Sequence, residues 1–307
     1  MELFVRKTLF ALILSTSCVF AASGTTGYEL FRTDGFARSS GLAGSSIAHW
    51  GDLSSLQTNP AGLAAITHAT GVAGFTKHVL DINQGTLAYA RPAKNHIVWA
   101  AGIDYLNYGS FDRADENGFK SGEFGASDFQ LRGAISQSVR PELRIGAVLK
   151  YQYRDIDGIA ATAIAGDVGL QYETGFNDWT VGAAIRSFGV ATSAFLSEKD
   201  ALPTSYELGF SVPLEHLPVK FSVAGAYVTD EGPEGRGGLE IGFTRQFIGR
   251  LGYSTIGIDQ RTGLSSDAFA GFSAGLGLRA KRLAFDYALT SHGEIGFLNR
   301  FSIGTEL

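Results

Sequence analysis

The stretch that decides the fold is L-R-I-G-A-V-L-K-Y-Q-Y-R, residues Leu143–Arg154. Polar and small residues alternate there with a second set that is apolar: Leu143, Ile145, Ala147, Leu149, Tyr151 and Tyr153. Because successive side chains of a β-strand point to opposite faces, this alternation predicts a strand with one apolar face. The apolar face ends in two tyrosines, as strands do where they cross the headgroup region of a membrane.

Similar alternation recurs to the end of the chain and predicts about fourteen strands. Their centres are expected near residues 73, 88, 101, 131, 148, 167, 184, 208, 223, 241, 252, 273, 286 and 303. The spacing leaves about 17 residues for each strand and its turn, which suits membrane strands of about 9–11 residues. A soluble β-sandwich also alternates, but its strands average about 5–6 residues. We therefore expect an all-β fold, a transmembrane antiparallel β-barrel over residues 70–307.

The first residues have the pattern of an export signal. Arg6 and Lys7 precede an apolar stretch, and the small residues Ala21 and Ala22 follow it. This pattern predicts a signal peptide over residues 1–21, with the cut after Ala21 or, as an alternative, after Ala22. The single cysteine, Cys18, would leave with it. A lipoprotein cut before Cys18 is the other alternative, although the preceding residues match that pattern poorly.

Residues 22–69 do not alternate and are rich in small side chains. Asn59-Pro60 is a helix-start pattern, because Asn caps free N–H groups and Pro at the first helical position loses no needed donor. We expect one or two helical turns from Pro60 to about Ile66. Fourteen strands would enclose a lumen wide enough to need partial filling, so residues 22–69 are predicted to be a plug. The alternative is an extension into the periplasm.

Composition argues against several classes of function. The chain has 307 residues, 40 of them Gly, with 18% charged residues and a formal charge of −5. It shows no basic patch or tail, so we expect no nucleic-acid partner. None of the six histidines has a metal-ligand spacing. We predict no catalytic, cofactor-binding or metal-binding residue, no cofactor, and no enzymatic activity.

Two runs of small residues resemble the start of the PorV/PorQ family of outer-membrane barrels, which are related to FadL-type transporters. The runs are Phe36–Gly44 and Asn59–Leu63. Later stretches resemble the PorQ branch: Asn107–Phe111, Gly122–Asp128, Ala201–Pro203, Leu214–Val219 and Gly271–Arg279. From the two first runs we single out the candidate plug motif: Arg38, Gly41, Gly44, Asn59, Pro60 and Gly62.

The resemblance implies an outer-membrane location and leaves two functions open. A PorQ-like barrel would anchor the surface attachment complex of type IX protein secretion, with PorZ-like and sortase-like proteins as partners beside the membrane lipid. A FadL-like barrel would instead be a passive transporter of hydrophobic small molecules, with the plug as gate, a hydrophobic pocket behind it and a lateral opening. The longest expected loops, Asp112–Gly125 and Ser193–Leu202, are short for the capture of solutes and favour the anchor.

Overall fold

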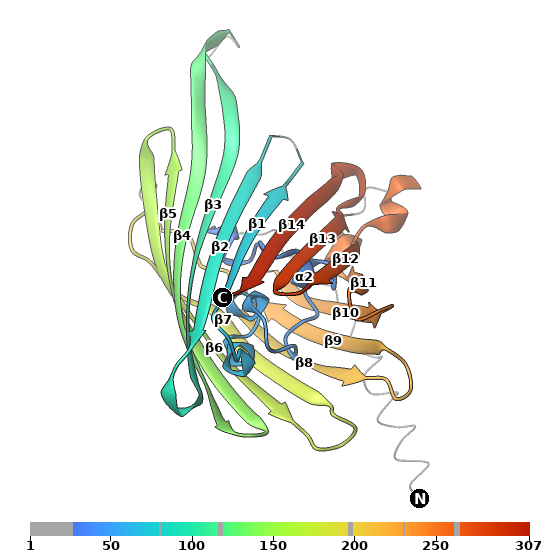
Figure 1. The fold of residues 1–307 in the computed structure, drawn as a ribbon. Coiled ribbons are helices and arrows are strands. Elements are labelled where there is room, and N and C mark those ends of the chain that lie inside the picture. The colour runs from blue at the N-terminus through green and yellow to red at the C-terminus, as the bar shows by residue number, and fades with distance from the viewer. Residues whose placement is uncertain (1–26, 80, 116–118, 196–198, 230, 261–264) are drawn as a thin grey trace, which may run out of the picture.

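The computed structural model describes residues 27–79, 81–115, 119–195, 199–229, 231–260 and 265–307 (Figure 1). The predicted signal peptide, with Cys18 and its cut after Ala21, lies outside the described residues. The strands are β1 (Thr70–Lys77), β2 (Asn83–Pro92), β3 (Ile97–Ala114), β4 (Lys120–Arg140), β5 (Leu143–Ile156), β6 (Ile159–Glu173), β7 (Thr180–Ala191), β8 (Ser205–Pro213), β9 (Val219–Val228), β10 (Gly232–Gly242), β11 (Phe247–Ser254), β12 (Phe272–Ala280), β13 (Leu283–Ser291) and β14 (Phe297–Glu306). The short helices are η1 (Glu29–Phe31), α2 (Ala37–Ser40), η2 (Leu53–Leu56), η3 (Pro60–Ala65), η4 (Lys94–His96), α3 (Ile256–Asp259), η5 (Ser265–Phe269) and η6 (Gly293–Ile295).

The strands close into one antiparallel barrel in which each strand pairs with its neighbours in sequence. Closure is made by β1 and β14, where Thr70 lies opposite Glu306 and Phe75 opposite Phe301. A closed barrel leaves no unpaired sheet edge. The predicted fold class is therefore confirmed, and among the described residues each of the fourteen expected strand centres falls within a strand.

The apolar face of each strand lies on the outside of the barrel. In β5, Leu149 is 66% exposed whereas its neighbour Lys150 is 1% exposed. A soluble sandwich would bury the apolar face and expose the polar one. The observed arrangement is that of a barrel in lipid, and it excludes the sandwich alternative. Within the described part of the chain, no helix is long and apolar enough to cross a membrane.

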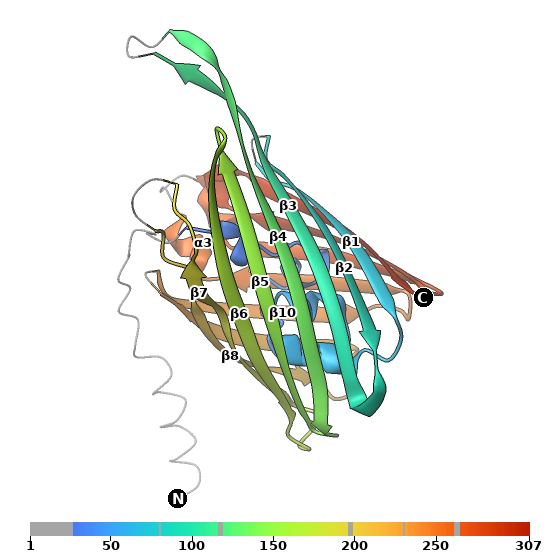
Figure 2. The same cartoon turned by 90° about the vertical axis from the view of Figure 1, so that its left-hand side faces the viewer.

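The two ends of the barrel differ. At one end, which we call the base, β1 begins and β14 ends, and the strands are joined by short turns at residues 93–96, 141–142, 174–179, 214–218, 243–246 and 281–282. The opposite end, the rim, has longer connections at residues 192–204 and 255–271. The β3–β4 hairpin extends beyond the other strands at the rim (Figure 2).

The expectation of a loop over Asp112–Gly125 is wrong. β3 continues to Ala114 and β4 begins at Lys120, and Phe111 lies opposite Phe124 in their ladder. Those two rings stack with centroids 5.4 Å apart. Cross-strand pairing of aromatic side chains stabilises a hairpin, which explains why the strands persist beyond the barrel.

The segment 27–69 lies inside the barrel, as the blue ribbon in Figures 1 and 2 shows, and we call it the plug. Its apolar side chains Leu53, Leu56 and Leu63 are buried in one cluster with small inward residues of β2–β5. The helix expected from Pro60 is present as the 3₁₀-helix η3. The side chain of Asn59 accepts a hydrogen bond from the backbone of Ala61, as a helix cap does.

Glycines on the inner wall allow the plug backbone to approach closely. A Cβ added to Gly169 of β6 would overlap Asn59 Oδ1, and one added to Gly146 of β5 would lie 2.7 Å from the amide nitrogen of Ala61. Real Cβ atoms do not come this close to other atoms, so only glycine fits at these positions while the plug stays in place.

Candidate functional site

Of the predicted plug motif, Arg38 makes the electrostatic contacts. It lies in α2, pairs with Asp52 of the plug, and reaches the wall at Glu240 of β10, with 3.2 Å between Arg38 Nη2 and Glu240 Oε1. Arg250 of β11 donates to the same carboxylate at 2.7 Å. Arg38 therefore ties two parts of the plug to the barrel through one shared carboxylate.

Asn59 and Pro60 hold the other half of the plug. The amide of Asn59 donates to the carbonyl of Ile47 at 2.8 Å and to that of Leu170 in β6 at 3.1 Å. The carbonyl of Pro60 faces Gly146 of β5. The side chain of Asn59 thus links two segments of the plug to strand β6 of the wall.

The three motif glycines sit at close approaches. Gly41 lies against Gly275 of β12, and Gly44 has a left-handed φ of 75° beside Arg236. A Cβ on Gly62 would lie 2.7 Å from the carbonyl oxygen of His49, inside the plug. The six motif residues thus do not surround one cavity. They contact several strands of the wall and other segments of the plug, and these contacts hold the plug in position.

Sequence reasoning missed the charged pairs that line the lumen. Two buried examples are Lys150 with Asp167, 2.7 Å apart, and Arg186 with Glu207, 2.8 Å apart. The alternation places these side chains on the inner faces, and that was the available signal. Which charge meets which depends on strand register, which the alternation does not contain.

The plug also buries a histidine, His49, which is 3% exposed. Among the described residues neither ring nitrogen has a hydrogen-bond partner. Burial, with the nearby cations Arg38 and Lys220, lowers the pKa of His49 to about 3. The ring is therefore neutral at neutral pH.

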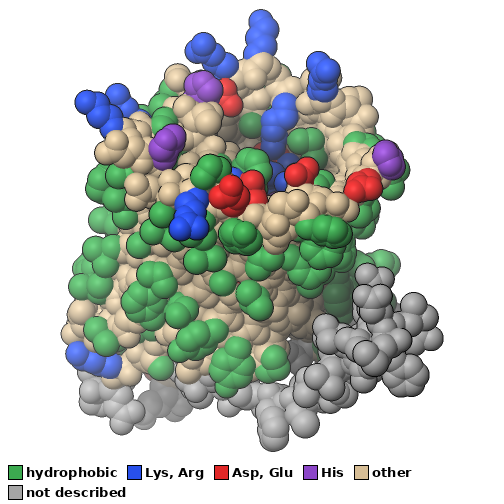
Figure 3. All heavy atoms as spheres, turned by 90° about the horizontal axis from the view of Figure 1, so that it is seen from below, with side chains coloured by type: hydrophobic (Ala, Val, Ile, Leu, Met, Phe, Trp, Pro, Cys, Tyr) green, Lys and Arg blue, Asp and Glu red, His purple; other side chains and the backbone are tan. Residues whose placement is uncertain are grey.

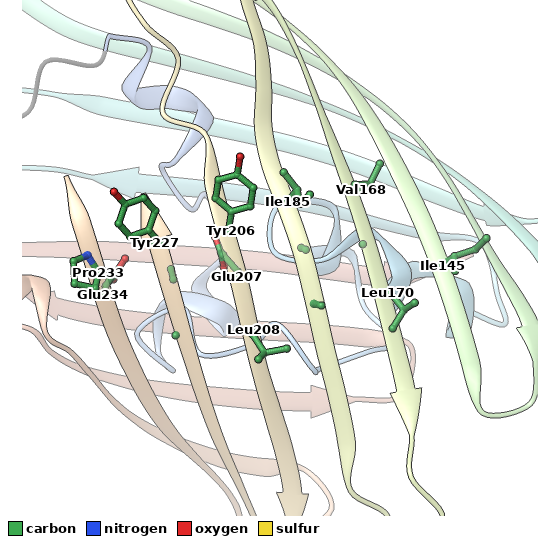
Figure 4. A pocket seen from close by; sticks show the side chains of 15 residues that line it. Ile145, Val168, Leu170, Ile185, Tyr206, Glu207, Leu208, Tyr227, Pro233 and Glu234 are labelled. Carbon is green, nitrogen blue, oxygen red and sulfur yellow. The ribbon is translucent and has the colours of Figure 1, made fainter. Parts of the chain in front are cut away.

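A groove with a volume of about 810 Å³ lies on the outer wall over β5–β10 (Figure 4). Its upper row is formed by Ile185, Tyr206, Tyr227 and Pro233, which point outward from four neighbouring strands. The next outward row carries small residues, with Ala183 and Gly225 on either side of Leu208. Small residues between large ones hollow the wall. The carboxylates of Glu207 and Glu234 lie behind it and pair with luminal arginines.

Beside this groove the wall is incompletely paired. The ladder between β7 and β8 ends at Arg186 opposite Ser205, whereas β7 continues to Ala191. A β-bulge at Ser187, with φ of 54°, marks the place. Thr204 Oγ1 donates to the carbonyl of Ser187 at 3.1 Å in place of a strand partner. This part of the wall is held by side chains, which separate more easily than a continuous ladder.

An apolar cluster lies behind the incomplete ladder. Tyr28 and Phe31 of the plug pack with Leu202 and with alanines of β6 and β7. Tyr28 also donates to the carbonyl of Thr162 at 3.0 Å. The cluster closes the barrel on the luminal side at the point where strand pairing stops.

The described residues contain no group of three or more His, Cys, Asp or Glu side chains able to hold a metal ion. The functional features of the wall and plug are apolar surfaces, ion pairs and close contacts.

Comparison with known proteins supports the fold. No family model matches the sequence, and no curated protein matches it. The structure is similar to the toluene transporter TodX of Pseudomonas putida, with 12% identity and a TM-score of 0.61 over 90% of this chain and 98% of that one. It is also similar to a FadL homologue of Pseudomonas aeruginosa, with 11% identity and a TM-score of 0.59 over 94% of this chain and 100% of that one.

The monoaromatic hydrocarbon channel CymD gives the same result, with 11% identity and a TM-score of 0.61 over 88% of this chain and 97% of that one. At this identity the likeness establishes the fold, that of FadL-family barrels, and nothing about the solute. These neighbours are described as transporters and channels, not as enzymes. The resemblance to the PorV/PorQ branch stays a prediction, since no family model supports it.

Proposed function

We propose that the protein is a passive channel for apolar small molecules in an outer membrane. The observation that carries the proposal is the apolar groove beside the incompletely paired wall between β7 and β8. The plug lies in the lumen and packs against its wall, in the path that a polar solute would take through the barrel. A hydrophobic solute could instead contact the apolar cluster on the luminal side of the wall and the groove on its outer side.

The route runs from the rim to the groove. A solute that enters at the rim meets the apolar cluster of Tyr28, Phe31 and Leu202. Displacement of this cluster would open the side of the barrel above Arg186 and Ser205, where no ladder has to break. The solute would then move into the groove and from there into the surrounding lipid. This transfer is favourable because it removes the apolar surface of the solute from water.

The neighbours support this class of solute. TodX is described as a toluene transporter and CymD as a monoaromatic hydrocarbon channel. They share the fold with this chain. The short turns at the base agree with an orientation in which the base faces the periplasm and the rim faces outward.

Uptake measurements test the proposal. In a bacterial host without hydrophobic-solute channels of its own, the protein should raise the initial uptake of a labelled monoaromatic hydrocarbon several-fold. Gly225→Phe should return uptake toward the background, because it fills the groove at a position where an added Cβ has no atom within 4 Å.

Gly133→Phe is the matched control. Gly133 is also exposed on the outer wall, in β4, an added Cβ there likewise has no atom within 4 Å, and it does not line the groove. Equal uptake by Gly225→Phe and the unchanged protein, or no uptake above the host, would reject the channel.

The type IX anchoring function stays a second candidate, because the β3–β4 hairpin projects from the rim and carries two exposed aromatic side chains, Phe111 and Phe119, which are 42% and 72% exposed. Exposed aromatic side chains on a projecting hairpin suit a protein partner such as a PorZ-like subunit. Shortening this hairpin should release such a partner and leave hydrocarbon uptake unchanged. If cargo stays anchored at the cell surface when the whole protein is deleted, the anchoring function is excluded.

A further inference from the structure

A second concavity lies on the outer surface near the base, between β2 and β3. It has a volume of about 490 Å³. On β2, Tyr89 and Arg91 point outward, and on β3 their direct partners are Ala101 and Trp99. Trp99 is 57% exposed and Tyr89 42% exposed. Ala101, opposite Tyr89, has a small side chain and leaves room for the cavity. The rings of Tyr89 and Trp99 form two of its walls, and it opens to the outside of the barrel.

Two cations stand at the base end of this cavity, which we call the β2–β3 site. They are Arg91 at the end of β2 and Lys94 in the turn that follows, and both are exposed. Among the described residues, neither has an ion-pair or hydrogen-bond partner. Elsewhere on the protein, exposed cations such as Arg113 and Lys120 at the rim are paired with carboxylates. Two unpaired cations in one cavity leave a positive charge that is open to a ligand.

Among the described residues, the base carries more exposed cations than exposed carboxylates, which are Glu142, Asp178, Glu215 and Glu306. Further exposed cations at the base are Arg140, Arg245, Lys281 and Arg282. Seen from below, hydrophobic side chains cover the wall, and charged side chains of both signs stand with His at the edge beyond it (Figure 3). The β2–β3 site lies at the base end of the apolar wall, where a membrane whose hydrocarbon covers that wall would have its headgroups.

We propose that the β2–β3 site binds the headgroup of an anionic phospholipid. The guanidinium of Arg91 offers the fork of donors that matches two phosphate oxygens, and Lys94 adds a second positive charge. Tyr89 and Trp99 flank the glycerol and upper acyl chains, because aromatic rings with one polar edge favour this depth of a membrane. The occupant is a lipid and not a soluble phosphate, since the aromatic walls of the cavity are continuous with the lipid-facing wall.

Quenching of Trp99 fluorescence by brominated lipid tests the proposal. The Trp50→Phe/Trp179→Phe variant leaves Trp99 as the single tryptophan. In phosphatidylcholine vesicles, brominated phosphatidylglycerol should quench Trp99 at a lower mole fraction than brominated phosphatidylcholine does. Arg91→Gln should weaken this preference about fivefold, and Arg91→Gln/Lys94→Gln should abolish it, as each cation near an anionic lipid contributes about a factor of five.

Arg245→Gln/Arg282→Gln is the matched control, because it removes two exposed base cations in other turns. The control should retain the preference. Equal quenching by both lipids, or an equal loss in the control, would overturn the proposal. So would displacement of brominated phosphatidylglycerol by millimolar glycerol phosphate, which would identify a soluble phosphate as the occupant. Native mass spectrometry of the chain with its own three tryptophans provides a second readout if the tryptophan variants fold poorly.

Discussion

Gly169→Ala should loosen the plug although it adds only one methyl group. Gly169 is on the inner face of β6, and an added Cβ would overlap Asn59 Oδ1 and come within 3.0 Å of Pro60 Cδ. Asn59 is fully buried. Because protein interiors are close-packed, we expect the substitution to displace the plug or bend the strand.

The expected loss follows from the contacts of Asn59. Its side chain donates to Ile47 and Leu170 and accepts from Ala61. Each buried hydrogen bond contributes about 1 kcal/mol net, so losing these contacts lowers the free energy of unfolding by about 3 kcal/mol. Overpacking a close contact costs a comparable amount, about 1–3 kcal/mol.

Urea unfolding in lipid vesicles measures the effect. Gly133→Ala in β4 is the control, because its Cβ has no atom within 4 Å. It should change the free energy of unfolding by less than about 1 kcal/mol. Swelling of the same vesicles in sugar solutions reports the plug directly, and Gly169→Ala should let sugars pass.

The double variant separates plug contact from strand effects. In an Asn59→Ala background the oxygen that Gly169 faces is gone and only the contact with Pro60 Cδ remains, so Gly169→Ala should then cost clearly less than in the unchanged protein. Equal costs in both backgrounds, or equal stability of the Gly169→Ala and Gly133→Ala proteins, would refute the explanation that the plug requires glycine there.

Three further predictions concern buried ionisable side chains. Lys150→Met leaves Asp167 buried without its cation and should lower the free energy of urea unfolding by about 3–5 kcal/mol, whereas Lys150→Met/Asp167→Leu should recover most of this. Arg38→Ala removes the shared partner of Asp52 and Glu240, and should cost about 2 kcal/mol and speed protease cleavage of the plug. The pKa of His49 is lowered to about 3 in the folded protein. As the pH falls, the imidazole of His49 is therefore protonated in the unfolded chain near pH 6.5, well before it is protonated in the folded protein. Stability from His49 is therefore complete above about pH 6.5 and falls by about 3 kcal/mol by pH 4, a slope that His49→Gln should remove in urea titrations across this range.

The barrel was predictable because one physical rule repeats in every strand. Lipid requires an apolar outer face, and the period of two in Leu143–Arg154 shows which residues supply it. The helix start at Asn59-Pro60 was predictable for a local reason, since capping depends on neighbouring residues. The loop over Asp112–Gly125 was mispredicted because cross-strand contacts, such as that between Phe111 and Phe124, extend the hairpin beyond the lipid.

The groove and the ion pairs could not be predicted in the same way. The groove depends on which small outward residues fall in one row across three strands, as Ala183 and Gly225 do beside Leu208. The pair of Lys150 and Asp167 depends likewise on the register of β5 with β6. Register is a long-range property, and a shift by a single residue would exchange the two faces of a strand.

The contacts of the plug differ along its length, and this difference indicates which part can move. From Arg38 to Ile66 it is fixed by the Arg38 ion pairs, the Asn59 hydrogen bonds and close contacts at wall glycines. Tyr28 and Phe31 pack in an apolar cluster beside the stretch where β7 and β8 do not pair, and this part of the plug is also tied to the wall by the hydrogen bond of Tyr28 to Thr162 and by the ion pair of Arg32 with Glu231. Apolar contacts lack the directional constraint of buried hydrogen bonds, and an apolar solute can replace them with contacts of its own. On the proposed channel function, an apolar solute would displace the apolar cluster of Tyr28 and Phe31, whereas ion pairs and hydrogen bonds hold the rest of the plug to the wall.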